Sequence, residues 1–229
     1  SLLDDPGAYA ALKDRVEIEF ALTNPALYRA DEPVALEVDL KNVPTLVVKV
    51  FEINALNYFL ATGREVDTTI DLDGLVASEE KTYASDDPPV RRSRRRFELP
   101  ALAGAGVWVV EFLGGGISSR ALVRKGRMRA VERIGAAGHV FTVFDEDRKP
   151  LPEATLWLAG REFRAEGGEI RVPFTTEPGR KSILLRHGAD LEDATGADRA
   201  AAEQIARVHR RVARAALDHL REVVAQVLE

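Results

Sequence analysis

Apolar and polar residues alternate along most of this chain, from residue 16 to about residue 186. In segments 16–22 and 34–40, an aliphatic or aromatic residue occupies every second position. Successive side chains of a β-strand point to opposite faces, so this period of two predicts strands that bury one face. Segment 46–53 is richer in β-branched and aromatic residues, which favours a central strand.

The rest of the first half combines this alternation with turn residues. A short helix is expected from Pro6 to Lys13, with Asp5 as its N-cap. Segment 54–60 fits either a helical turn or a bulged strand. Segment 65–72 is predicted to be a strand, and 78–89 a polar loop.

Glycine marks a hairpin later in the same region. The run Gly114-Gly115-Gly116 accepts the positive φ angles that tight turns require. The strands expected around it are 94–99, 107–113 and 117–124.

A second series of short strands follows residue 125. Turn signals separate these strands at spacings of about 8–12 residues, which is typical of β-sandwiches. The predicted members are 128–133, 139–145, 154–158, 161–164, 169–172 and 181–186.

The period changes to three or four near residue 198. Asp198 is a suitable N-cap, and residues 199–229 contain neither glycine nor proline. We therefore predict a long amphipathic helix whose apolar stripe either docks on the chain's own sandwich or pairs with a second copy in a homo-oligomer. The stripe consists of Ile205, Val208, Val212, Ala216, Leu220, Val223 and Val227.

Together these patterns predict a mainly β chain with two consecutive antiparallel β-sandwich domains, similar to fibronectin type III, and a long C-terminal α-helix. The predicted organisation is a lead-in with a short helix at 1–14, a first sandwich at 15–125, a second and smaller sandwich at 126–190, and a linker with the long helix at 191–229.

Composition limits the chemistry more than it directs it. The 229 residues are 45% hydrophobic and 30% charged, with a formal net charge of −5, as in ordinary soluble domains. The absence of cysteine excludes disulfides, zinc–thiolate sites and thiol nucleophiles. No apolar run reaches the roughly 20 residues that span a bilayer. Since no signal peptide is visible and Ser1 is not a natural start, the chain is interpreted as a processed form or a fragment.

The strongest charge feature is an arginine run with five guanidinium groups in six residues. Such a run attracts phosphate, anionic lipid or an acidic protein. The alternative, which we favour, is a solvated loop leading into an edge strand, where charge discourages edge-to-edge pairing. Apart from Phe97 no aromatic residue is interleaved, which disfavours nucleic acid. The run consists of Arg91, Arg92, Arg94, Arg95 and Arg96.

The remaining candidates for chemistry are weaker. Asp145-Glu146-Asp147 lacks the spacing of an EF-hand and is predicted to be a polar turn. No pair among the four histidines has the i, i+4 spacing of a helical metal site. We therefore predict no catalytic residue, no metal site and no cofactor.

Several motifs occur in an order that is typical of one family. Residues 99–111 read L-P-A-L-A-G-A-G-V-W-V-V-E, and residues 138–145 read G-H-V-F-T-V-F-D. Residues 149–158 read K-P-L-P-E-A-T-L-W-L, and residues 28–34 read Y-R-A-D-E-P-V. These segments resemble bacterial α2-macroglobulin-like proteins over roughly residues 16–188.

The resemblance implies two macroglobulin-like sandwich domains of seven strands each and an extracytoplasmic location. In that family such domains are structural, and the thioester lies in a separate domain with a Cys-Gly-Glu-Gln motif that this chain lacks. The leading hypothesis is a non-catalytic structural or protein-interaction module of a larger macroglobulin-like protein, with neighbouring domains or another protein as partner. The alternative is an independent protein that binds an anionic ligand or an acidic protein through its arginine-rich loop.

Overall fold

The computed structural model describes residues 6–174, 183–187 and 190–193. The chain divides into two compact units, Ser1–Arg127 and Met128–Glu229. The predicted long helix and its apolar stripe, residues 205–227, lie outside the described residues.

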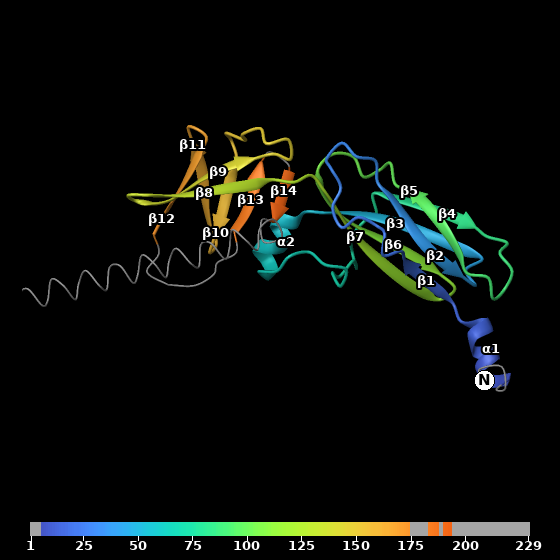
Figure 1. Cartoon of the computed structure of the whole chain (residues 1–229). Helices are drawn as coiled ribbons and strands as arrows, with labels where there is room; N and C mark the ends of the chain where they lie inside the picture. The colour runs from blue at the N-terminus through green and yellow to red at the C-terminus, as the bar shows by residue number, and fades with distance from the viewer. Residues whose placement is uncertain (1–5, 175–182, 188–189, 194–229) are drawn as a thin grey trace, which may run out of the picture. The chain divides into compact units, whose positions relative to one another are not determined.

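The first unit is a sandwich of two antiparallel sheets, one with three strands and one with four (Figure 1). The three-stranded sheet has the order β1-β2-β5, and the four-stranded sheet has the order β4-β3-β6-β7. The strands are β1 (Glu17–Phe20), β2 (Ala35–Lys41), β3 (Thr45–Ile53), β4 (Glu79–Ala84), β5 (Ser93–Glu98), β6 (Gly106–Gly114) and β7 (Ile117–Lys125).

Alternation along the strands builds the core between these sheets. Leu36, Val38 and Leu40 of β2 are buried there. Phe112 of β6 is fully buried and contacts the rings of Phe20 and Phe97 edge-on, each with its centroid 5.2 Å away. Edge-to-face packing places the positive ring edge on the negative ring face, which adds to the gain from burial.

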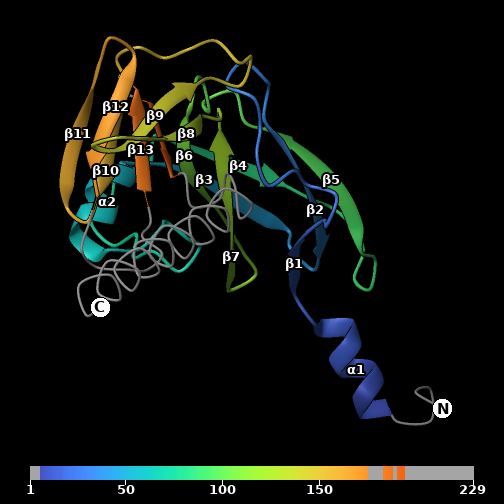
Figure 2. The ribbon, with the colours of Figure 1, turned by 60° about the vertical axis from the view of Figure 1, so that its left-hand side comes forward.

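Two short helices flank the first unit. The first, α1 (Pro6–Asp14), confirms the predicted helix and extends beyond the end of β1 (Figure 2). The second, α2 (Ala55–Thr62), settles the open question at 54–60 in favour of a helix. It begins where the Asn54 side chain accepts a hydrogen bond from the Asn57 N–H group, and it ends at Gly63 with φ 68°. Neither helix has the length and apolar character needed to cross a membrane.

Segment 63–78 covers the outer side of the four-stranded sheet and forms a second apolar cluster there. Val66, Ile70 and Leu72 are buried against Phe51 and Val109 of that sheet. The first unit is therefore apolar on both faces of β3 and β6, which explains the continuous apolar run in β6.

Two predicted elements in this region were wrong. Segment 65–72 is not a strand, because its backbone turns at Asp67, whose carboxylate accepts hydrogen bonds from the Thr69 N–H and hydroxyl groups. The apolar spacing there reflects packing on the sheet below. Residues 79–84 of the predicted polar loop form the edge strand β4, whose pairing with β3 supplies stability that its polar sequence does not show.

The second unit forms one antiparallel sheet with the order β14-β13-β10-β11-β12-β9-β8. Strand β11 pairs with β10 through residues 161–164 and with β12 through residues 165–166, so it belongs to both halves of a folded sheet. The strands are β8 (Arg129–Gly135), β9 (Gly138–Phe144), β10 (Thr155–Leu158), β11 (Arg161–Glu166), β12 (Glu169–Pro173), β13 (Ile183–His187) and β14 (Asp190–Asp193).

The two halves of this sheet share one core. Phe141 and Ile170 come from the β8-β9-β12 half, and Leu156 and Leu185 come from the β10-β13 half. The unit therefore has the packing of a β-sandwich although a single sheet forms both layers. The prediction of a mainly β chain with sandwich domains is confirmed for the described residues.

Candidate interaction surface

The outer face of the three-stranded sheet in the first unit carries rows of opposite charge. Cross-strand register places Glu19 of β1 opposite Asp39 of β2, and Asp39 opposite Arg94 of β5. The core-facing residues of β1 and β2 are apolar, so the alternating positions that point outward on these two strands are free to be charged. The Asp39–Arg94 pair has opposite charges and stabilises the sheet by about 0.2–1 kcal/mol, whereas Glu19 and Asp39 are like charges that repel one another unless a cation lies between them.

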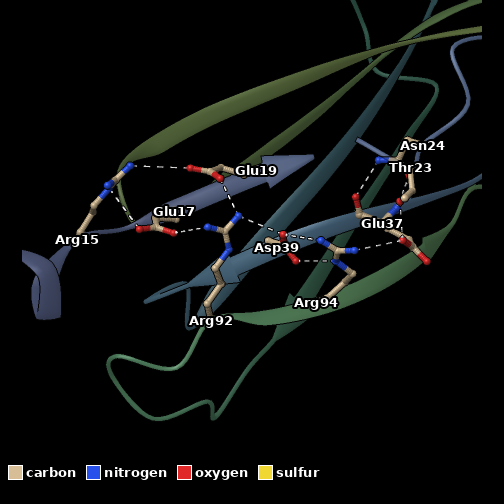
Figure 3. Close-up of polar contacts among 9 residues, drawn as sticks. All are labelled: Arg15, Glu17, Glu19, Thr23, Asn24, Glu37, Asp39, Arg92 and Arg94. Atoms are coloured by element: carbon tan, nitrogen blue, oxygen red, sulfur yellow. Dashed lines mark hydrogen bonds and ion pairs between the residues drawn. The ribbon is translucent and has the colours of Figure 1, made fainter. Parts of the chain in front are cut away.

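Arg92 is the centre of the contacts on this face (Figure 3). Its Nη2 atom lies 2.7 Å from Oε2 of Glu19 and 3.1 Å from Oδ2 of Asp39, and its Nη1 atom lies 3.4 Å from Oε2 of Glu17. Arg15 approaches the same two glutamates of β1, at 3.3 Å from Glu17 and 3.9 Å from Glu19. Arg92 directly precedes β5, and its guanidinium group therefore links the start of β5 to both β1 and β2.

Arg94 binds Asp39 in a bidentate pair. Its Nε and Nη2 atoms donate to Oδ1 and Oδ2 of Asp39 at 2.8 and 2.9 Å. The hydrogen bonds and charges of Arg94 and Arg92 lower the pKa of the Asp39 carboxyl group to about 2. Because two hydrogen bonds fix the planar guanidinium, the Arg94 side chain is held in one orientation on an exposed face.

Asn24 extends the sheet beyond the end of β1. Its side-chain amide donates to the carbonyl of Glu37 at 2.8 Å, and its carbonyl oxygen accepts the Glu37 N–H group at 2.8 Å (Figure 3). The side chain thus takes the place of a strand neighbour for β2. The neighbouring Thr23 hydroxyl donates to the Glu37 carboxylate at 3.1 Å. From the sequence, Asn24-Pro25 indicates only a turn, because a side chain that replaces a strand neighbour leaves no local pattern.

The predicted arginine run does not form one positive patch. Arg95 lies on the opposite side of β5 from Arg94, and its Nη2 atom lies 2.8 Å from Oδ2 of Asp87. Hydrogen bonds from Ser93 and Ser85, and then from Arg95, lower the pKa of Asp87. Arg91 and Arg96 are exposed, and the described residues offer neither a carboxylate within ion-pair distance. Three of the five guanidinium groups are therefore occupied by carboxylates.

A second polar cluster, which sequence reasoning missed, fixes segment 63–78 to the sheet. Nε of Arg120 donates to Glu111 at 2.8 Å, and its Nη1 atom donates to the Ile70 carbonyl at 3.0 Å. Nη2 of Arg124 reaches the Glu65 carboxylate and the Val66 carbonyl, both at 3.2 Å. The sequence feature that could have indicated this cluster is Glu111, a charged residue inside the otherwise apolar run 107–113.

The other sequence candidates are structural where they can be seen. The Asp145 carboxylate accepts the N–H groups of Asp147 and Lys149 at 2.9 and 2.8 Å, which makes a polar turn. His139 is the second residue of β9 and contacts the Glu132 carboxylate through Nδ1. Within the described ranges, no group of three or more His, Asp and Glu side chains could hold a metal ion.

Comparison with known proteins gives two likenesses. Residues 46–126 match the family model described as the AbpF first immunoglobulin-like domain. The chain is also 36% identical over 187 residues to actin-binding protein F of Dictyostelium discoideum, a region that covers 80% of this chain and 8% of that relative. The chain therefore spans less than a tenth of the relative's length.

A solved structure shows the same fold at low sequence identity. Native alpha-2-macroglobulin from Escherichia coli, in a structure that spans its MG0, NIE and MG1 domains, matches with a TM-score of 0.50 and 14% identity, covering 78% of this chain and 64% of that chain. The chain is therefore similar to the first immunoglobulin-like domain of AbpF over residues 46–126 and, in fold, to macroglobulin domains.

Proposed function

We propose that this chain is a pair of non-catalytic protein-interaction modules within a longer protein, and that filamentous actin is its partner. The observation that carries the proposal is the extent of the similarity to actin-binding protein F. An alignment of 187 residues is longer than the first unit, which ends at Arg127, so the similarity continues into the second unit. Similarity across both units is expected if both units bind the partner together.

The outer face of β1, β2 and β5 supplies the recognition surface of the first unit. Its guanidinium and carboxylate groups are already fixed by one another, so binding a partner immobilises few additional rotamers. Arginine is enriched at protein interfaces, where its fixed fork of donors gives geometric specificity. Arg91 and Arg96 border this set and remain available to an acidic partner.

Cosedimentation of the whole chain with filamentous actin tests the proposal. We expect the chain to pellet with filaments, and we expect the Arg91→Glu/Arg96→Glu double variant to pellet less, because it replaces two available cations with anions. Arg64→Glu, at an exposed arginine in the segment that covers the opposite side of the first unit, is the control and keeps native binding. A chain that stays in the supernatant at low ionic strength overturns actin as the partner. Equal pelleting of native and double variant overturns the charged face as the surface.

The anionic-ligand hypothesis remains a second proposal, supported by Arg91 and Arg96 alone. Heparin is a suitable probe, with its affinity measured against salt concentration. Each guanidinium group that neutralises an anion releases counterions. The logarithm of the affinity should therefore fall with the logarithm of the salt concentration, with a slope of about two for two available guanidinium groups and about five for a patch of all five. Absence of any salt-dependent binding contradicts this second proposal.

The location of the protein stays a prediction. The extracytoplasmic assignment depends on the resemblance to macroglobulins, and a likeness of 14% identity shows the fold alone. Fractionation of cells that express the parent protein, followed by detection of this region, decides the question.

A further inference from the structure

Strand β8 (Arg129–Gly135) differs from the other edge strands of the molecule. It pairs with β9 on one side and ends the order of its sheet on the other. No backbone hydrogen bond to another described segment occupies its outward side. A row of unpaired N–H and C=O groups is a template for another strand, and proteins usually protect such edges with charge.

The side chains of β8 protect this edge poorly. Val131 is 52% exposed and Ile134 is 45% exposed, and they lie on opposite faces of the strand. The edge strands β1, β4 and β5 carry no exposed large apolar side chain, and β7 carries one, Ile117, at its hairpin end. Among edge strands whose side chains the structure describes, β8 alone exposes apolar side chains to both sides of an added strand.

Charge on β8 indicates the chemistry of that strand. Arg129 and Arg133 share a face with Val131, at alternate positions. Arg133 is held by Glu169 at 2.6 Å, whereas Arg129 has no ion pair among the described residues. On the other face, Glu132 is engaged by His139, and Ile134 lies opposite His139 in the register. An added strand would therefore place an acidic residue opposite Arg129 and apolar residues opposite Val131 and Ile134.

A second copy of this chain does not fit the edge. In a symmetric antiparallel pair, the residue on the two-fold axis faces its own copy. With Val131 on the axis, Arg129 of each copy faces Arg133 of the other; with Glu132 or Arg133 on the axis, that charge faces itself. These are the three registers that pair most of β8, and each sets like charges directly opposite, which destabilises a sheet.

We propose that the free edge of β8 binds an extended, acidic strand of another protein by antiparallel β-pairing. Main-chain hydrogen bonds along the edge supply affinity, and the alternation of Arg129, Val131 and Arg133 selects an acidic–apolar–acidic pattern on one face of the incoming strand. This site lies wholly in the second unit. It does not depend on the charged face of the first unit. An experiment can therefore contradict strand binding at β8 and support actin binding, or contradict actin binding and support strand binding.

A synthetic seven-residue peptide tests the site on the whole chain. It carries glutamate opposite Arg129 and Arg133, lysine opposite Glu132, valine opposite Ala130, Val131 and Ile134, and glycine opposite Gly135. We expect saturable binding by fluorescence anisotropy, together with slower hydrogen exchange at the outward-facing amides of β8. A peptide with its charges exchanged is expected to bind at least about fivefold more weakly, because it sets like charges opposite each arginine.

Two matched variants separate β8 from other edges. Val131→Glu places an anion at the centre of the edge, beside the glutamates of the peptide, and is expected to weaken binding at least about fivefold. Ile117→Glu makes the same change at the exposed apolar position of β7 and is expected to leave binding unchanged. Because both positions are exposed, both variants are expected to keep the native melting temperature.

Two results would overturn the proposal. One is native affinity in Val131→Glu, or exchange protection that appears on another strand. The other is a doubling of mass in light scattering of the peptide-free chain that Val131→Glu abolishes, since the edge would then bind a second copy.

Discussion

The two outer faces of the first unit are treated in opposite ways. On the three-stranded sheet, the outer face is exposed and carries ion pairs between Arg92, Arg94 and the acidic residues of β1 and β2. On the four-stranded sheet, segment 63–78 and α2 cover the outer face with apolar side chains, and Arg120 fixes that cover. The covered face gains stability from burial, whereas the exposed face is ordered by ion pairs between its own side chains.

Under our proposal, one sandwich divides stability and recognition between its two faces. Burial of apolar surface stabilises by about 25 cal/mol per Å². Exposed ion pairs contribute about 0–1 kcal/mol each, since water competes for both charges. Substitutions on the covered face should therefore affect unfolding most, and substitutions on the charged face should affect binding most.

The largest effect is expected from Phe51→Ala. Phe51 is 5% exposed and packs between the sheet and its cover, so the truncation leaves a cavity in the covering layer. We expect the free energy of unfolding to fall by about 3–5 kcal/mol, measured by urea denaturation. Val76→Ala, at a position 90% exposed in the same segment, is the control and should change stability by less than about 0.5 kcal/mol. Similar small losses in both variants would contradict the covered face.

A smaller loss is expected from Arg120→Ala. The substitution removes the ion pair to Glu111, which is 8% exposed, and the hydrogen bond to the Ile70 carbonyl. We expect a loss of about 1–2 kcal/mol, because a mostly buried carboxylate loses its charged donor. Amides of residues 63–78 should exchange faster, as measured by hydrogen exchange, while those of β1 and β2 keep native rates. Faster exchange throughout the unit would show that Arg120 does not act on the cover specifically.

Acid should weaken the charged face through Asp39. Its folded pKa of about 2 lies below the ordinary value of 3.8, so the folded state binds fewer protons and its stabilisation is complete only above that ordinary value. Stability is therefore expected to fall as pH decreases from about 4 toward 2. The Asp39→Asn variant should show a shallower fall in thermal melts over this window. In Arg94→Ala, nuclear magnetic resonance titration should show the pKa of Asp39 rising toward 3.8, and an unchanged titration would contradict the assigned cause.

The smallest effect on stability is expected from Arg91→Ala/Arg96→Ala. Neither side chain has an ion-pair partner in the described part of the chain, so each change should alter the free energy of unfolding by less than about 0.5 kcal/mol. Native melting combined with weaker actin cosedimentation would show that recognition is separable from stability on this face. A clear drop in melting temperature would mean that these arginines are structural.

Local pattern was sufficient for most elements of both units. Strands β2, β3, β6 and β7 lie where alternation or apolar runs predicted them, and Gly115 and Gly116 form the predicted hairpin with φ 56° and 81°. The two errors have different causes: strand 79–84 is polar and depends on its pairing with β3, whereas the error at 65–72 came from the spacing of apolar residues. Spacing of apolar residues reports that a segment packs on something, but it does not distinguish pairing in a sheet from lying over one.

The candidate surface was only half visible in the sequence. The arginine run was recognised, but its carboxylate partners Glu17, Glu19 and Asp39 lie more than 50 residues away in the chain. Their approach depends on the β1-β2-β5 register, which local patterning does not encode. For the same reason the sequence did not show that Arg94 pairs with Asp39, whereas Arg95, on the other face of β5, pairs with Asp87.

What the sequence alone determined is the alternation that makes this chain a β protein, because the two-residue period of a strand is a local property of the backbone. Only tertiary structure decided which charges neutralise one another, which sheet face is covered, and which edge stays open. Those outcomes arise from contacts between segments that are distant in sequence, and their free energy exists only once the strands have paired.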